Sequence, residues 1–201
     1  MNLNNFFSSQ IILENELLIL QPLAEIDIDA IESISYSDEL GEFGKRVKSR
    51  KDLAEYFDYC FNSKKAKELY PFIIFNKTNN KPIGITMFGN ISFPHKRLEI
   101  GWTWIGEQFQ GTGINYQCKK LLLDYCFDEL RLRRVEFKID IKNIRSQKAI
   151  EKIGAIKEGL LRNYNIQSYG ESTGTYIYSI LKDEWEDIKL NKSYENYILQ
   201  R

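Results

Sequence analysis

Two glycines stand close together, Gly111 and Gly113, in the stretch GEQFQGTGINYQCKK from Gly106 to Lys120. The residues before them have the pattern of a strand and those after them the pattern of a helix. Backbone N–H groups at the start of a helix lack partners and carry a partial positive charge. Because glycine lets a ligand approach these groups closely, the stretch predicts a cradle for a phosphate or pyrophosphate. A tight strand-to-helix turn without a ligand explains the same residues equally well.

Two common phosphate-binding motifs do not fit this stretch. The P-loop needs Lys and then Ser or Thr directly after its last glycine, and neither glycine is followed by that pair. The motif G-x-G-x-x-G of dinucleotide-binding folds fails because Tyr116 stands where the third glycine belongs. The spacing that does occur is Q-x-x-G-x-G, formed by Gln108, Gly111 and Gly113.

This spacing resembles the pyrophosphate-binding motif of the GNAT acyl-CoA N-acetyltransferases. A second block, from Asn143 to Ala155, is similar to the N-x-x-S-x-x-x-x-E-K-x-G-F/A segment of the RimJ/RimL branch, which acetylates protein N-termini. The likeness extends over residues 12–188, with its motifs in the order usual for that branch. The further matching blocks are PL-x-x-x-D at 22–27, LEIGW at 98–102, EG-x-LR at 158–162, YSIL at 178–181 and EW at 184–185.

The resemblance implies an α/β (α+β) GNAT fold, with a mixed central sheet of about seven strands flanked by helices. It also implies that residues 1–201 form a single GNAT N-acetyltransferase domain. The strand ending at Ile105 and the strand at 134–140 would splay apart, with acetyl-CoA in the gap and no metal. The first of these strands would bind the pantetheine arm as an added strand, and N–H groups of residues 109–114 would hold the pyrophosphate. The implied cofactor-binding residues are Trp102, Trp104, Ile105, Gln108, Phe109, Gln110, Gly111, Thr112, Gly113, Ile114, Asn115, Asn143, Ser146, Lys148 and Lys152.

Several of these residues also have a purely structural explanation. Asn143 can cap the helix that follows it while also reaching the pantetheine. Ser146, in the first turn of that helix, can reach the cofactor or act as a cap. Lys148 and Lys152 can meet the adenosine phosphates or simply be solvated, and Asn115 can turn its amide into the site.

Acetyl transfer to an amine needs a neutral amine, a polarised thioester carbonyl and a stabilised thiolate. The resemblance implies Glu99 as the catalytic base, because many GNAT enzymes carry a catalytic glutamate on this strand. Glu99 would take the amine proton directly or through water. The alternative is a structural glutamate that pairs with Lys96 or Arg97. A backbone N–H near Trp104 and Ile105 would polarise the carbonyl.

The general acid is the point at which the sequence departs from the family. Ile150 stands at the position aligned with the family's usual tyrosine. Ser146 is the remaining catalytic candidate near the thiolate, and Tyr164 is a less favoured one. Because a thiol is far more acidic than an alcohol, the reaction can also proceed without an acid.

The partners implied are acetyl-CoA and an amine acceptor. An α-amine has a pKa near 7.7–8, against about 10.4 for lysine, so a protein N-terminal α-amine is the first choice. A small-molecule amine (a polyamine, an amino acid or an antibiotic) is the alternative, and a non-catalytic acyl-CoA-binding sensor is an alternative of another class. The acceptor would bind the hairpin at 164–174 and the segment 38–51, although a solvated loop is the favoured explanation for 38–51. Four aromatic residues could form an acceptor pocket or belong to the core: Phe88, Phe93, Trp102 and Trp104.

The elements that must position these residues follow from hydrophobic periodicity. The helix after the glycine loop shows it best, with an apolar stripe that includes both of its cysteines. This order of elements favours a largely antiparallel first half and excludes a regularly alternating doubly wound fold. The expected strands are 16–21, 70–76, 82–92, 96–105, 134–140, 156–166 and 173–181. The expected helices are 26–35, 50–62, from the glycine loop to about 130, 144–153 and about 182–190.

Composition narrows the class of protein. The chain has 201 residues, of which 43% are apolar, so a substantial core can form. Lys and Arg number 28, and so do Asp and Glu, which argues against a nucleic-acid partner. The N-terminus lacks a basic start, and Glu14 and Glu16 interrupt its apolar stretch, so we expect no signal peptide, no membrane contact and a cytoplasmic location. The sequence gives no oligomeric state, and a homodimer stays open.

Cysteine and histidine chemistry has little support. The three cysteines, Cys60, Cys118 and Cys126, form no C-x-x-C motif and are expected to be buried thiols. His95 is the single histidine, in the turn-like stretch FPHKR, so a histidine-dependent nucleophile is not expected.

Overall fold

The structure is a computed structural model that describes residues 2–35, 47–166 and 170–190. Its described strands form a single sheet with the order β1-β2-β3-β4-β5-β6-β8-β7. All neighbours are antiparallel except β5 and β6, which are parallel. The bounds are β1 Leu13–Glu14, β2 Leu18–Pro22, β3 Leu69–Asn76, β4 Pro82–Ser92, β5 Arg97–Ile105, β6 Arg134–Asp140, β7 Ile156–Ile166 and β8 Ser172–Leu181. The expected mixed sheet is confirmed, with eight described strands instead of about seven because the two-residue β1 adds one edge.

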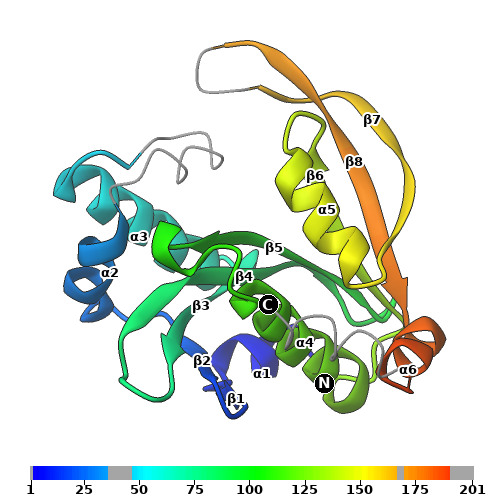
Figure 1. Cartoon of the computed structure of the whole chain (residues 1–201), viewed down its shortest axis with the longest axis horizontal. Helices are drawn as coiled ribbons and strands as arrows, with labels where there is room; N and C mark the ends of the chain where they lie inside the picture. The colour runs from blue at the N-terminus through cyan, green and yellow to red at the C-terminus, as the bar shows by residue number, and fades with distance from the viewer. Residues whose placement is uncertain (1, 36–46, 167–169, 191–201) are drawn as a thin grey trace.

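Helices cover both faces of this sheet (Figure 1). Helices α2 and α3 contribute to one core cluster, whereas α1, α4, α5 and α6 contribute to the other. Helix α1 was not expected, because six residues are too few to show a period. The bounds are α1 Leu3–Ser8, α2 Asp27–Ser35, α3 Arg50–Lys65, α4 Ile114–Asp124, α5 Ile144–Lys152 and α6 Lys182–Leu190. A π-helical turn at Tyr125–Glu129 continues α4.

The two clusters follow from the alternation of side chains along the strands. On β5, Leu98 and Ile100 belong to the cluster under α4, whereas Trp104 belongs to the cluster under α2 and α3. Phe88 and Phe93 lie in or against the α4 cluster, on the face opposite the two tryptophans. The four aromatic residues therefore do not form one acceptor pocket, and the core explanation holds for Phe88.

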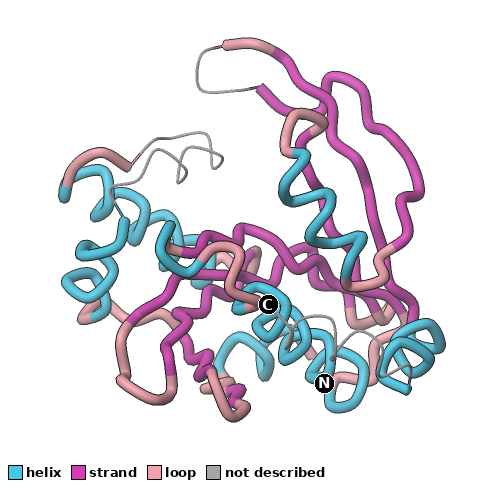
Figure 2. The backbone as a smooth tube through the Cα atoms, in the orientation of Figure 1, coloured by secondary structure: helices cyan, strands magenta, loops and turns pink. Residues whose placement is uncertain are grey.

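The parallel pair β5–β6 is short. Residues 97–99 of β5 pair with residues 134–136 of β6, and no later residue of β5 pairs with β6. From there β5 stays beside β4, while β6 pairs with β8 along its whole length. We call β6, β7, β8 and α5 the arm, and the remaining described elements the body. Figures 1 and 2 show the arm leaving the body at this junction, as the expected splay requires.

A β-bulge interrupts β5 just beyond the junction. Gly101 pairs with Met87 and Trp104 pairs with Ile85, so two residues of β5 oppose the single residue Thr86 of β4. One of the two, Trp102, has a φ of +50°, which a bulky side chain rarely adopts. The bulge bends β5 at the place where it loses β6 as a neighbour.

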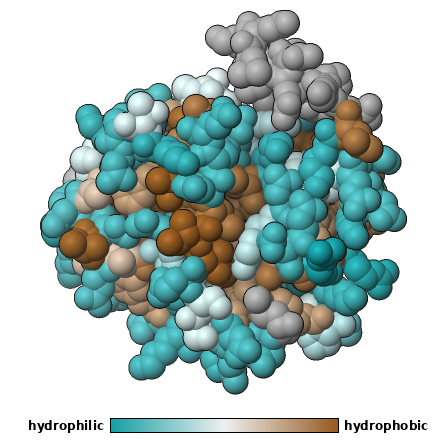
Figure 3. Space-filling model, turned by 90° about the horizontal axis from the view of Figure 1, so that it is seen from below, coloured by the Kyte–Doolittle hydropathy of each residue, from teal (hydrophilic) through white to brown (hydrophobic). Residues whose placement is uncertain are grey.

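One face of the molecule is largely hydrophilic around a central apolar area (Figure 3). No helix in the described ranges is long and apolar enough to cross a membrane.

Candidate functional site

The glycine loop connects the end of β5 to the start of α4. A short 3₁₀ turn, Glu107–Phe109, leads into it. Gly111 and Gly113 have φ values of +72° and +83°, in the left-handed region that glycine adopts without strain. Gly113 is the N-cap of α4, and no side chain caps the helix there. The first-turn N–H groups therefore keep the free capacity and partial positive charge that an anion needs.

Side chains of the loop hold its shape from within. The Thr112 hydroxyl donates to the Phe109 carbonyl at 2.6 Å, and Gln110 Nε2 donates to the Ile105 carbonyl at 3.2 Å. Arg145 Nη1, from the first turn of α5, donates to Gln110 Oε1 at 2.6 Å. Gln110 thus ties the loop on the body to the arm. Gln108 is exposed, and Phe109 packs against the core under α4.

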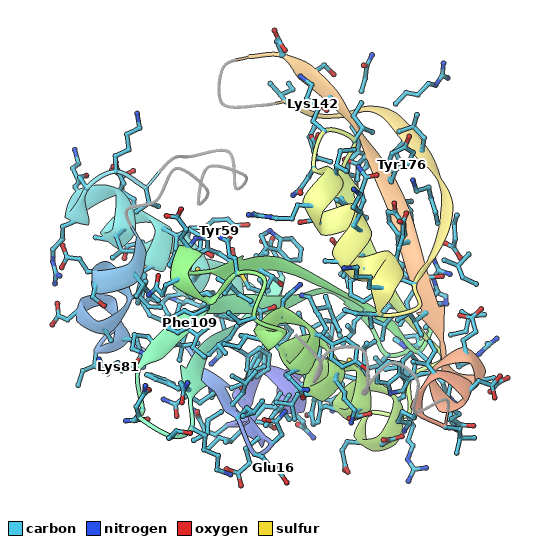
Figure 4. The ribbon with its side chains drawn as sticks, viewed as in Figure 1. Glu16, Tyr59, Lys81, Phe109, Lys142 and Tyr176 are labelled. Carbon is cyan, nitrogen blue, oxygen red and sulfur yellow. The ribbon has the colours of Figure 1, made fainter. Side chains whose placement is uncertain are left out.

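Figure 4 shows the two sides of this region. Phe109 and Tyr59 lie on the body, and Lys142 and Tyr176 lie on the arm. Lys142 lies two residues after the end of β6, in the turn that leads into α5.

Two buried polar atoms near the loop have no hydrogen-bond partner among the described residues. They are the Trp104 indole nitrogen, on β5, and the Asn115 side-chain oxygen, in the first turn of α4. Buried polar atoms are normally paired, because an unpaired one costs about 1–3 kcal/mol. Both residues are among those that the resemblance implies for the cofactor. Trp104 packs in the cluster under α2 and α3, on the face of the sheet opposite α4, so it is the Asn115 oxygen that fits a polar ligand between β5 and α4. Trp102 is half-buried and Ile105 is buried.

Glu99 is buried at the base of the gap between body and arm. Its carboxylate lies 3.0 Å from Lys138 Nζ of β6 and accepts a hydrogen bond from Asn90 Nδ2 at 2.5 Å. Burial by itself lowers the pKa of Lys138, but attraction to Glu99 outweighs this and leaves the pKa raised. Arg97 pairs with Glu136 at 3.6 Å, so the expected structural alternative for Glu99 named the wrong partner.

Tyr164 of β7 lies beside this pair. Its ring centroid is 5.7 Å from Lys138 Nζ, and its side chain is about half exposed. The hydroxyl is therefore on the arm, at the side of the ion pair, and its ring attracts the ammonium.

The first turn of α5 is capped by Asn143. The Asn143 side-chain oxygen accepts a hydrogen bond from the Ser146 N–H at 2.9 Å, which confirms the capping explanation for Asn143. Ser146 is half-buried, and Lys148 is exposed. Ile150 belongs to the core, so the family's tyrosine position supplies no polar group. Lys152 is exposed in the last turn, far along the helix from Asn143.

Several neighbours of the site were not singled out from the sequence. Lys138 and Asn90 surround Glu99, Arg145 meets the loop, and Lys119 is buried under β5. Only Arg145 carried a usable signal, since it lies inside the matching block at the start of α5.

Several other predicted features lie away from the site or outside the described residues. Residues 36–46 and 167–169 lie outside the described ranges, so most of the expected acceptor segment 38–51 and the tip of the hairpin cannot be placed. The three cysteines are free and buried, as expected. In the described part of the chain no cluster of three metal-binding side chains occurs. A surface hollow of about 490 Å³ lies between α1 and α3, lined by residues away from the loop.

Comparisons with known proteins agree with this geometry. A family model described as acetyltransferase (GNAT) domain matches residues 18–156. The uncharacterized N-acetyltransferase p20 of Bacillus licheniformis is 34% identical over 114 residues, 57% of this chain and 63% of that protein. The ribosomal-protein-serine acetyltransferase of Escherichia coli (strain K12) is 33% identical over 91 residues, 45% of this chain and 49% of that protein. The chain therefore spans less than two thirds of the length of both relatives.

The fold has close counterparts among solved structures. A GCN5-related N-acetyltransferase from Brucella melitensis superposes with a TM-score of 0.84 at 22% identity, over 94% of this chain and 86% of that one. At this identity the likeness concerns the fold. The family model, in contrast, matches well over half of the sequence. The chain therefore belongs to the GNAT family of acetyltransferases, and its relatives support the RimJ/RimL-like branch.

Proposed function

We propose that this protein is an acetyl-CoA-dependent N-acetyltransferase, in which a primary amine attacks the thioester directly. The observation that carries the proposal is the divergence of β5 and β6 after Glu99, beside a helix start that no side chain caps. Among the described strands, the divergence leaves one edge of β5 without a partner, and the helix start offers N–H groups to an anion. In this proposal residues 1–201 act as one GNAT domain.

Acetyl-CoA would supply the activated acetyl group as a thioester. The N–H groups around Gly111 and Gly113 would hold the pyrophosphate, and the free edge of β5 near Trp104 and Ile105 would hold the pantetheine arm. The unpaired side-chain oxygen of Asn115 would accept a hydrogen bond from the pantetheine. The side-chain oxygen of Asn143 caps α5, and an asparagine amide can also donate hydrogen bonds, so we propose that Asn143 contacts the pantetheine through its amide group.

Glu99 is the proposed base. An ion pair with Lys138 and a hydrogen bond from Asn90 fix the position of its carboxylate, which is the group that would accept the proton. Protonation of Glu99 would remove its attraction to Lys138, so the pair must loosen during proton transfer. This cost is tolerable for an acceptor whose amine is already partly neutral, and it is a heavier burden for a lysine side chain.

Ser146 stays the proposed partner of the leaving thiolate. It is half-buried in the first turn of α5, where its backbone N–H donates to the side-chain oxygen of Asn143. Its side-chain hydroxyl is the group that would meet the thiolate. A thiolate is a good leaving group near neutral pH, so we expect Ser146 to assist and not to be essential.

For the acceptor we propose a protein N-terminal α-amine. The supports are the pKa argument and the relative from E. coli, whose name describes acetylation of a ribosomal protein at serine. A small-molecule amine, such as a polyamine, is the second candidate.

The test measures thiol release from acetyl-CoA with a panel of acceptors. The panel pairs short peptides that have a free α-amine with the same peptides blocked at the N-terminus but carrying lysine, and adds polyamines and amino acids. Release that requires the free α-amine supports the proposal, and release only with small amines selects the second candidate. Tight acetyl-CoA binding with no release from any acceptor would favour a non-catalytic sensor.

A further inference from the structure

Lys119 is a buried lysine that the proposed reaction does not use. It lies in the second turn of α4, with 3% of its surface exposed. No carboxylate in the described ranges forms an ion pair with it. Burial lowers the pKa of Lys119 to about 8. Lysine is rarely buried without a charged partner, because removing an ammonium from water is costly.

The ammonium is directed at the bulge of β5. Lys119 Nζ donates a short hydrogen bond to the Thr103 hydroxyl. That hydroxyl lies 2.8 Å from the Thr86 hydroxyl and 3.3 Å from the Gly101 carbonyl oxygen. A hydroxyl has one proton and two lone pairs. Thr103 can therefore accept from Lys119 and Thr86 while donating to Gly101, which uses its full capacity.

This network closes around the strained part of β5. Its members on β5 are Gly101 and Thr103, and the residue between them is Trp102 with a φ of +50°. Such a conformation costs roughly 1–3 kcal/mol and persists only when surrounding contacts enforce it. Lys119 supplies that enforcement from the α4 side of the sheet, where the bulge has left the regular ladder with β4.

We propose that Lys119 is a positioning residue: it holds the Gly101–Thr103 bulge so that the free edge of β5 meets the acyl end of acetyl-CoA. The inference rests on the proposed function, since it assigns β5 to the acyl-pantetheine half of the cosubstrate. Lys119 touches neither the cosubstrate nor the acceptor in this proposal. It acts through Thr103 and the backbone of the bulge.

The chain offers a matched control at the next position. Lys120 is on the same helix, is about 30% exposed and forms an ion pair with Asp124 at 3.3 Å. The test compares Lys119→Met, Lys120→Met, Thr103→Val and the double variant Lys119→Met/Thr103→Val with the wild-type protein. Binding is measured by calorimetry for acetyl-CoA and for its nucleotide half, adenosine 3′-phosphate 5′-diphosphate. Thermal unfolding is measured for every variant.

We expect Lys119→Met and Thr103→Val each to weaken acetyl-CoA binding by about tenfold, the loss of one hydrogen bond to a charged group. Affinity for the nucleotide half should stay unchanged, because the glycine loop is intact. The double variant should be no worse than the worse single variant, since both changes break one network. Lys120→Met should bind both ligands like the wild type. Lys119→Met should unfold at the same or a higher temperature, since an apolar side chain replaces a buried charge.

Three results would overturn the inference. One is wild-type affinity for acetyl-CoA in Lys119→Met, which would show that the buried lysine has no part in binding. A second is an equal loss for both ligands together with a lower unfolding temperature, which would make it a general structural residue. A third is a wild-type protein that does not bind acetyl-CoA, which would remove the proposed function as well. If the wild type binds acetyl-CoA but releases no thiol, and the variants behave as expected, the inference stands and the catalytic proposal fails.

Discussion

The buried Glu99 forms an ion pair with the partly exposed Lys138 at the base of the gap, and Glu99→Gln tests the part of Glu99 in proton transfer. We expect the rate of thiol release to fall about 100-fold near neutral pH, a usual loss for a general base. The loss should shrink as pH rises, because a larger share of the amine is then neutral without help. The pH–rate profile checks this.

Glu136→Gln is the matched control, since Glu136 of β6 pairs with Arg97 of β5 and with Arg134 of its own strand. It should leave the shape of the profile unchanged. The same profile in Glu99→Gln and in the wild type would remove Glu99 from the base role.

Lys119 links residue chemistry to stability. Between pH 8 and 10.5 the folded wild-type protein has released the Lys119 proton, whereas the unfolded chain still binds it. Lys119 therefore makes the free energy of unfolding increase with pH between pH 8 and 10.5. Between pH 8 and 10.5, the free energy of unfolding of the wild type should rise by up to about 3 kcal/mol relative to that of Lys119→Met.

Denaturant unfolding of both proteins at several pH values measures this difference. Burial raises the pKa of Cys118 to about 11 and that of Cys60 to about 12, which lowers stability above pH 9, but both proteins carry these thiols. The comparison cancels the contribution of Cys60. The charge of Lys119 lowers the pKa of Cys118, so the stability difference is measured below pH 9, where the Cys118 thiol keeps its proton, as well as above it. A stability difference that stays constant from pH 7 to 10.5 would contradict a buried, easily deprotonated Lys119.

At the scale of elements, the start of α4 depends on the left-handed backbone of the glycine loop. Gly111→Ala should lower the free energy of unfolding by about 1–2 kcal/mol and weaken acetyl-CoA binding, because φ at this position is +72°. An added Cβ would meet nothing within 4 Å at Gly111, so a clash is not the cause. Gly159→Ala on β7 is the control: it also has open space, and its φ lies outside the left-handed region. Equal effects of the two substitutions would refute the backbone explanation.

The start of α5 separates capping from binding. Asn143→Ala removes the cap and should lower the free energy of unfolding by about 1 kcal/mol. Asn143→Asp keeps a cap oxygen but lacks the amide protons, so it should restore stability while acetyl-CoA affinity stays reduced. Unfolding curves and calorimetry on both variants check this. Full affinity in Asn143→Asp would leave Asn143 with capping alone.

At the scale of the whole molecule, acetyl-CoA should bind the body and the arm together. Hydrogen exchange should then slow both in residues 100–115 of the body and in α5 of the arm. At 100 times Kd the free energy of unfolding should rise by about 2.7 kcal/mol. Protection confined to the body would show that the arm takes no part in binding.

Sequence periodicity predicted most elements, because their apolar residues repeat with a clear period. The alternation of Val135, Phe137 and Ile139 placed β6 with its correct bounds. The glycine loop was readable because spacing alone brings Gln108, Gly111 and Gly113 together. Lys119 was missed because the stripe along α4 was drawn from apolar residues only, and a buried lysine has no sequence signature. The partner of Glu99 was missed because strand register across the parallel pair depends on the whole sheet.

The brief contact between β5 and β6 also bears on the order in which the chain folds. Strands β3, β4 and β5 are consecutive antiparallel neighbours, so this part of the body is built from local contacts, which form fast. The arm joins that sheet through three residue pairs of one parallel strand, and its own ladder needs β8 to reach back past α5 and β7. Closing such a long loop is slow, so the sheet from β3 to β5 should form before β6 has a partner on both sides. The junction between β5 and β6, which opens a space for a cosubstrate, is thus also the part of the sheet that forms last.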